Sequence, residues 1–164
     1  MWVIMEEDER KAAWDKVYDT FDFKPDYYSE EHAFKFDIPY DEYQLTGITD
    51  YENYEKTMRE IMVDCIGDDE YMYALNWQHT GFRYNPKGVQ PIGESEHVDD
   101  SRYFGGYVAY YLTFYPDGDY YFFIARDFSW GYLSHPWQKR VWIFGDKLRN
   151  RVTDSLKVLE LAEI

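Results

Sequence analysis

The stretch from Tyr107 to Ala125, YVAYYLTFYPDGDYYFFIA, carries the strongest structural signal in the chain. Two aromatic-rich runs, Tyr107–Tyr115 and Tyr120–Ala125, flank the sequence Pro-Asp-Gly-Asp at 116–119. Proline presets φ for a turn, aspartate bonds its own backbone and glycine takes the left-handed conformation, so the two runs are predicted to pair as a β-hairpin. Alternation along the first run predicts a tyrosine-lined face and a core face, the latter formed by Val108, Tyr110, Leu112 and Phe114.

Further short strands are predicted on both sides of this hairpin. Tyr71–Trp77 and Gly81–Tyr84 precede it and Val141–Phe144 follows it, all rich in aromatic or β-branched residues. Another strand, Ala33–Ile38, is expected before the proline at position 39. Asn85–Ser101 holds two prolines and two glycines and is predicted to be one long loop.

Apolar residues recur at helical spacing near both ends of the chain. Asp8–Phe21 is predicted to be an amphipathic helix that ends before Pro25. A second helix is expected to open with a capping box of Thr49 and Glu52 and to end at Gly67. Its buried face is predicted to comprise Tyr54, Met58, Ile61, Met62 and Cys65. A closing helix is indicated by Leu148, Val152, Leu156 and Leu159.

Together these elements predict a single α+β domain over residues 1–164, in which two N-terminal helices and a C-terminal helix pack on an antiparallel β-sheet. Residues 1–68 are expected to be helical and acidic, 69–145 rich in strands, and 146–161 the closing helix. Cys65 is the single cysteine, so an internal disulfide is excluded and a reducing, cytoplasmic location is expected. The first five residues lack a basic flank and a long apolar run, so neither a signal peptide nor a membrane anchor is expected.

The composition combines many aromatic residues with a large negative charge. The chain has 18 tyrosines, 11 phenylalanines and 6 tryptophans, and its formal net charge is −15. Tyrosine and tryptophan give rigid contact area at interfaces, whereas surplus carboxylates repel nucleic acid and anionic lipid and attract cations. A basic cluster between Lys139 and Arg151 fits the solvated face of a helix, so no nucleic-acid partner and no membrane partner is predicted.

Five segments spaced along the β-rich half resemble the signatures of the DUF2716 family of uncharacterised bacterial proteins. They are ALNWQH at 74–79, PDGDYYFF at 116–123, Asp127-Phe128 with Gly131, His135-Pro136-Trp137, and VWIFG at 141–145. The resemblance implies a helical lead-in before residue 70 and no activity that can be carried over. By a looser analogy of class, small acidic proteins of this kind are similar to immunity proteins, which neutralise toxins.

The leading hypothesis is a cytoplasmic immunity or inhibitor-type protein that occludes a cationic toxin domain, expected to be a nuclease, through an acidic, aromatic-lined surface. The first predicted contact set is Glu30, Glu31, Asp37, Tyr40, Asp41, Glu42, Tyr43, Asp68 and Asp69. The second set is the ring-bearing trio Trp130, Tyr132 and Trp137. The simpler interpretation is that the acids keep an aromatic-rich surface dissolved, and that the 128–137 loop folds under its own rings with His135 bonded to the backbone.

Four residues that could line an aromatic pocket suggest a different class of function. Trp77, His79, Asp127 and His135 could bind a small ligand, or serve a metal-dependent enzyme. The histidines lack the tight spacing of a zinc-protease motif, and Asp117 and Asp119 suit a turn for backbone reasons alone. The sequence therefore predicts no catalytic residue, no metal and no cofactor, and the chain is not expected to be an enzyme.

Overall fold

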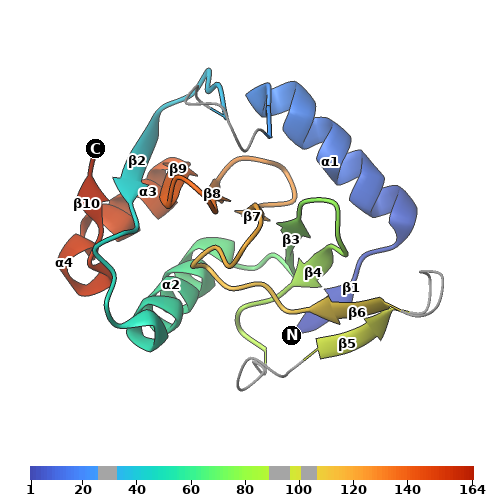
Figure 1. The fold of residues 1–164 in the computed structure, drawn as a ribbon. Coiled ribbons are helices and arrows are strands. Elements are labelled where there is room, and N and C mark those ends of the chain that lie inside the picture. The colour runs from blue at the N-terminus through green and yellow to red at the C-terminus, as the bar shows by residue number, and fades with distance from the viewer. Residues whose placement is uncertain (26–32, 89–96, 101–106) are drawn as a thin grey trace.

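The computed structural model describes residues 1–25, 33–88, 97–100 and 107–164, and the side chains of these except 97–100, 107 and 108 (Figure 1). The strands are β1 (Trp2–Ile4), β2 (Tyr40–Gln44), β3 (Met72–Asn76), β4 (Phe82–Tyr84), β5 (His97–Asp100), β6 (Tyr107–Tyr110), β7 (Tyr121–Ile124), β8 (Gly131–His135), β9 (Arg140–Phe144) and β10 (Ala162–Glu163). The helices are α1 (Glu7–Phe21), α2 (Tyr51–Ile66), α3 (Asp146–Thr153) and α4 (Leu156–Leu159). Among the described residues no helix is long and apolar enough to span a membrane.

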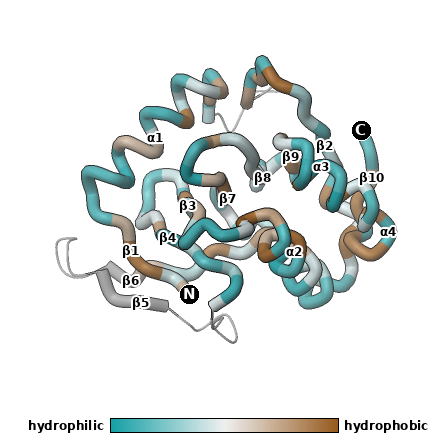
Figure 2. The backbone as a smooth tube through the Cα atoms, turned by 180° about the vertical axis from the view of Figure 1, so that it is seen from behind, coloured by the Kyte–Doolittle hydropathy of each residue, from teal (hydrophilic) through white to brown (hydrophobic). Residues whose placement is uncertain are grey.

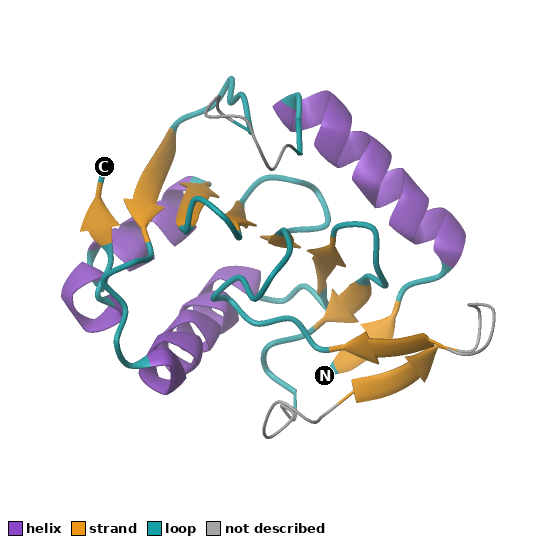
Figure 3. Cartoon of the chain, in the orientation of Figure 1, coloured by secondary structure: helices purple, strands orange, loops and turns teal. Residues whose placement is uncertain are grey.

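Eight strands form one sheet in the order β1-β4-β3-β7-β8-β9-β2-β10, and every described pair is antiparallel. The first and last strands of the chain therefore form the two edges, and the termini lie at opposite ends of the sheet (Figure 1). β5 and β6 pair separately as a two-stranded ladder (Figure 3). The expected α+β class with an antiparallel sheet is confirmed.

The sheet lies between two helical layers. α1 covers one face, and α2 covers the other together with α3 and α4 (Figure 1). The central strands are buried on both faces: along β9, Val141 and Ile143 face α2 while Trp142 and Phe144 face α1. A strand covered on both sides needs a continuous apolar run, which explains why β9 reads VWIF. α1 buries a single face and is mostly hydrophilic in Figure 2.

The predicted hairpin of 107–115 with 120–125 is wrong. β6 ends at Tyr110 and pairs with β5, whereas β7 pairs with β3 on one side and with β8 on the other. Because both edges of β7 are occupied by other strands, the segment from 111 to 120 crosses over as a loop, in which Gly118 has the predicted positive φ, at 88°. The predicted faces are reversed at two positions: Ala109 is buried and Tyr110 is exposed.

Other predicted boundaries also shift. Residues 33–38 do not form a strand; Lys35 N donates to Phe21 O at 2.7 Å, so this segment follows the end of α1 instead of joining the sheet. The strand forms beyond Pro39, as β2. β5 lies within the expected loop of 85–101, and the closing helix divides into α3 and α4. The first two helices and the burial of Cys65 are confirmed.

The capping of α2 also differs from the prediction. Asp50 is the N-cap residue, and its carboxylate accepts a hydrogen bond from Asn53 N at 3.0 Å. The Thr49 backbone and hydroxyl donate instead to Glu160, at 2.7 Å each. The predicted capping box fails because a carboxylate from the far end of the chain occupies the position expected for Glu52.

Candidate binding site at the aromatic end of the sheet

β3 and β8 end, and β7 begins, at the same end of the sheet. The pairs Asn76↔Tyr121 and Phe122↔Leu133 fix this arrangement. The residues just beyond those strand ends meet there with one residue of α1. We define this group as the aromatic end; it consists of Tyr18, Trp77, Tyr120, His135 and Trp137.

Tyr120 is the buried centre of the aromatic end. Its ring lies edge-on to Trp77, His135 and Trp137, with centroid distances of 5.6, 4.8 and 5.3 Å. Trp77 Nε1 donates to the Tyr18 hydroxyl at 3.1 Å, which ties α1 to the end of β3. Tyr18 and Trp137 are 40% and 39% exposed and Trp77 is half-buried, so aromatic surface faces solvent over a fixed base.

His135 is a structural part of this base. Its Nδ1 accepts from Trp137 N at 3.3 Å and from Gln138 N at 3.2 Å, as expected for the backbone-bonded alternative. The ring proton therefore resides on Nε2, which donates to the Tyr120 hydroxyl at 3.2 Å. Burial, with a smaller contribution from Arg140, lowers the pKa of His135 to about 4, so the ring is neutral at pH 7.

His79 forms the polar edge of the site. Its Nε2 lies 3.2 Å from Asp119 Oδ2, and Asp119 also accepts from the Tyr120 backbone at 2.7 Å. Burial raises the pKa of Asp119, and the bonds from Tyr120 and His79 partly offset that rise. Among the described residues no group of three potential ligands is placed to hold a metal ion.

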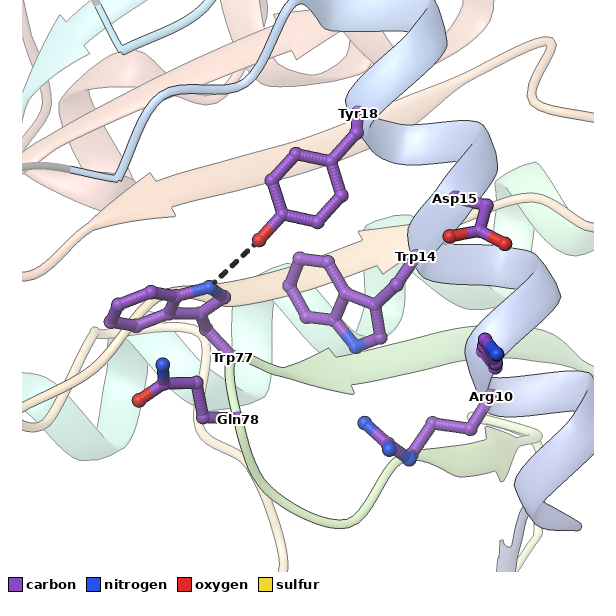
Figure 4. Close-up of a pocket in the computed structure, with 7 residues that line it drawn as sticks. Arg10, Trp14, Asp15, Tyr18, Trp77 and Gln78 are labelled. Atoms are coloured by element: carbon purple, nitrogen blue, oxygen red, sulfur yellow. Dashed lines mark hydrogen bonds between the residues drawn. The ribbon is translucent and has the colours of Figure 1, made fainter.

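A hollow of about 240 Å³ opens beside the aromatic end, between α1 and the turn after β3 (Figure 4). It is lined by Arg10, Lys11, Trp14, Asp15, Tyr18, Trp77 and Gln78. Gln78 has a φ of 64°, a conformation that non-glycine residues rarely adopt outside turns and functional sites.

The predicted acidic contact set does not form one free surface. Asp41 is paired with Arg149 at 3.0 Å and Glu42 with Arg140 at 3.1 Å, because β2 lies beside β9 and α3. Tyr43 is buried. Of the remaining members, Glu30 and Glu31 lie outside the described residues, while Asp37, Tyr40, Asp68 and Asp69 are exposed.

The three predicted aromatic anchors differ in burial. Tyr132 is fully buried, and its hydroxyl donates to Phe114 O at 2.7 Å, so it cannot contact a partner. It was predicted to lie in a loop, but residues 131–135 form β8, a central strand. Trp130 is half-buried, and Trp137 alone of the trio belongs to the aromatic end.

The predicted pocket of four residues is only partly assembled. Trp77 and His135 belong to the aromatic end and His79 to its polar edge, whereas Asp127 follows the opposite end of β7. There Asp127 accepts from the Ser129 hydroxyl at 2.6 Å and lines a second hollow with Asp69, Tyr73 and Arg126. Sequence patterns do not identify Tyr18 and Tyr120 as site residues, because helical spacing and strand alternation are typical of the core.

The family model described as "Protein of unknown function (DUF2716)" matches residues 4–149. The chain belongs to this family. The DUF2716 match includes every residue of the aromatic end, so this site is part of the family domain.

"Uncharacterized protein YxiI" of Bacillus subtilis (strain 168) is 36% identical to this DUF2716 protein over 93 residues. The match covers 57% of this chain and 50% of the relative, so the chain spans about half the length of the relative. No solved structure matches the chain.

Proposed function

We propose that the protein binds a cationic protein and inhibits it by covering its active surface, as an immunity protein does, with the aromatic end as the contact surface. The observation that carries this proposal is that partly exposed rings share one end of the sheet with acids from two segments. Asp15 and Asp19 lie on α1 beside Tyr18, and Asp117 and Asp119 lie in the turn beside Tyr120. Aromatic faces attract Lys and Arg side chains, and flanking carboxylates attract the same groups.

A toxin nuclease is the partner class that this chemistry fits. Nucleases hold phosphates with Lys and Arg, and carboxylates can occupy the same cationic positions. The net charge of −15 would accelerate the encounter, and the aromatic contacts would slow dissociation. The contact surface proposed here replaces the predicted set on β2, where Arg140 and Arg149 neutralise the acids.

A second candidate function is the binding of a small ligand. It is favoured by the hollow between α1 and the turn after β3, which has aromatic walls and a polar rim. The two functions differ in what stabilises the protein. A small ligand raises the melting temperature by mass action in the absence of any second protein.

The test uses the protein encoded by the gene next to that of this chain. The basic domain of that protein is purified and mixed with this chain. We expect a tight complex whose association rate falls steeply as NaCl rises. Trp137→Ala should weaken the complex roughly tenfold or more, because an aromatic side chain that becomes buried in an interface is a typical hot spot. The matched control is Tyr51→Ala, which removes another partly exposed ring, at the start of α2.

Both variants are first checked for an unchanged fold by circular dichroism. Equal losses for Trp137→Ala and Tyr51→Ala would show that the aromatic end is not the contact surface. An association rate that does not respond to salt would contradict the acidic steering. A basic neighbour that does not bind at all would remove the immunity assignment and leave the small-ligand function as the better candidate.

A further inference from the structure

The wall of the hollow beside the aromatic end includes a buried donor that has no acceptor among the described residues. Trp14 is 6% exposed, and its Nε1 has no hydrogen-bond partner among the described residues. A buried N–H normally has a partner, so one that lacks it needs an explanation, such as strain or a bound group. Figure 4 shows this nitrogen on the side of the Trp14 ring that faces Arg10.

The other polar groups of the hollow are mainly donors as well. Lys11 is exposed on its rim, and Arg10 lies next to it, held by Glu7 through Nε at 3.0 Å and Nη2 at 2.5 Å. The Tyr18 hydroxyl accepts from Trp77, so its own hydrogen remains to be donated. Among the described residues that line the hollow, Asp15 is the one carboxylate, against two cations.

The walls of the hollow are aromatic and fixed in place. The Trp77 indole is bonded to Tyr18 and packs edge-on against buried Tyr120. The volume of about 240 Å³ is below the roughly 300–1,000 Å³ of pockets for drug-sized ligands, so the space suits one residue-sized group.

We propose that this hollow binds a residue-sized carboxylic acid with a planar or apolar body. The carboxylate is held by Lys11 and Trp14 Nε1, and the body packs against Tyr18 and Trp77. Because neighbouring atoms cover Nε1, the carboxylate reaches it after a flexible rim side chain such as Arg10 moves aside. This goes beyond the proposed function and does not rest on it, since the acid binds without a protein partner.

The test is a titration followed by the indole N–H resonances in ¹H–¹⁵N NMR, with the Trp14 signal assigned by Trp14→Phe. The probes are 3-phenylpropanoate, which represents a free acid, and N-acetyl-phenylalanine, which represents the last residue of a polypeptide. The probe that binds more tightly shows whether the ligand is a free acid or the C-terminal residue of a polypeptide. We expect saturable shifts of the Trp14 signal, and at least tenfold weaker binding of N-acetyl-phenylalanine amide, which lacks the carboxylate.

Two lysine variants on the same helix separate a specific site from general attraction of anions. Lys11→Gln should weaken binding several-fold, whereas Lys16→Gln should not, because Lys16 lies over the Phe128 ring away from the hollow. Both positions are exposed, so neither variant is expected to unfold the protein. Equal binding of acid and amide, equal effects of both lysine variants, or an unmoved Trp14 resonance would each overturn the proposal.

Discussion

At the residue scale, Glu55 is the titratable group whose position has the clearest consequence for stability. Its carboxylate, on α2, accepts hydrogen bonds from Phe114 N at 2.8 Å and Tyr115 N at 2.7 Å. Burial raises the pKa of Glu55 to about 7, although these two bonds act in the opposite direction. Glu55 thus links the loop before β7 to α2. Its carboxyl group also holds a proton to a higher pH than an ordinary Glu does.

This arrangement predicts that stability falls as pH rises through the range where Glu55 titrates. An unfolded Glu loses its proton near pH 4.5 and the folded one near pH 7, so between these values the folded protein holds a proton that the unfolded chain has released. The free energy of unfolding should therefore decrease from about pH 4.5 to about pH 7, with a contribution from Glu55 of at most about 3 kcal/mol.

Urea unfolding at about pH 5 and about pH 8 measures this contribution. Glu55→Gln cannot titrate, so its loss of stability between the two pH values should be smaller than that of the native protein. Glu52→Gln, an exposed position on the same helix, serves as the control and should follow the native profile. Parallel profiles for all three proteins would show that Glu55 ionises as freely when folded as when unfolded.

At the element scale, the start of α2 depends on a contact between distant parts of the chain. Glu160 lies just after α4 and has a φ of 54°. Its carboxylate accepts from Thr49 N and Thr49 Oγ1 at 2.7 Å each and from Asp50 N at 3.1 Å. These bonds, led by the one from the Thr49 hydroxyl, lower the pKa of Glu160. The C-terminal segment therefore anchors the first turn of α2.

Two alanine variants distinguish this anchor from a local capping box. Glu160→Ala should lower the melting temperature by several degrees, because it leaves the Thr49 and Asp50 amides without their acceptor. Glu52→Ala should have almost no effect, since Glu52 is not the residue that binds Thr49. The opposite order of the two melting temperatures would show that the local capping box forms in solution.

Elements defined by local pattern were predictable, whereas their partners were not. The apolar spacing from Trp14 to Phe21 and the runs at 71–77 and 141–144 predicted α1, β3 and β9 to within two residues. The hairpin failed although its turn residues were interpreted correctly. Turn chemistry shows where a chain reverses, but β7 was already bordered by β3 and β8, and that competition involves residues far away in the sequence.

At the scale of the whole molecule, the candidate site could be predicted only in part because it is assembled from four separate segments. Trp77, His79 and His135 were recognised as possible site residues, and the register of β3, β7 and β8 brings them to one end. The same register sends Asp127 to the other end. No local pattern indicates that Tyr18 completes the site, because a tyrosine at helical spacing has the signature of the core.

The charge of the molecule also acts as a whole. Ion pairs such as Glu9 with Arg83 and Asp41 with Arg149 satisfy individual acids, but they leave the net charge of −15 unchanged. Partly exposed pairs contribute roughly 0–1 kcal/mol each, while like-charge repulsion acts between all the remaining acids. Salt weakens both effects. In this protein we expect the destabilisation by like-charge repulsion to be larger than the stabilisation by the ion pairs.

The last prediction is that added salt stabilises the protein. Raising NaCl from about 20 mM to about 300 mM shortens the screening length well below the size of the domain, so the melting temperature at pH 7 should rise by a few degrees. The double variant Asp15→Asn with Asp19→Asn removes two exposed acids from α1 and should show a smaller rise. A melting temperature that falls with salt would mean that the ion pairs at β2 and α1 hold the fold together more strongly than the surplus charge opposes it. The acids of the proposed contact surface would then serve to stabilise the fold and not to attract a cationic partner.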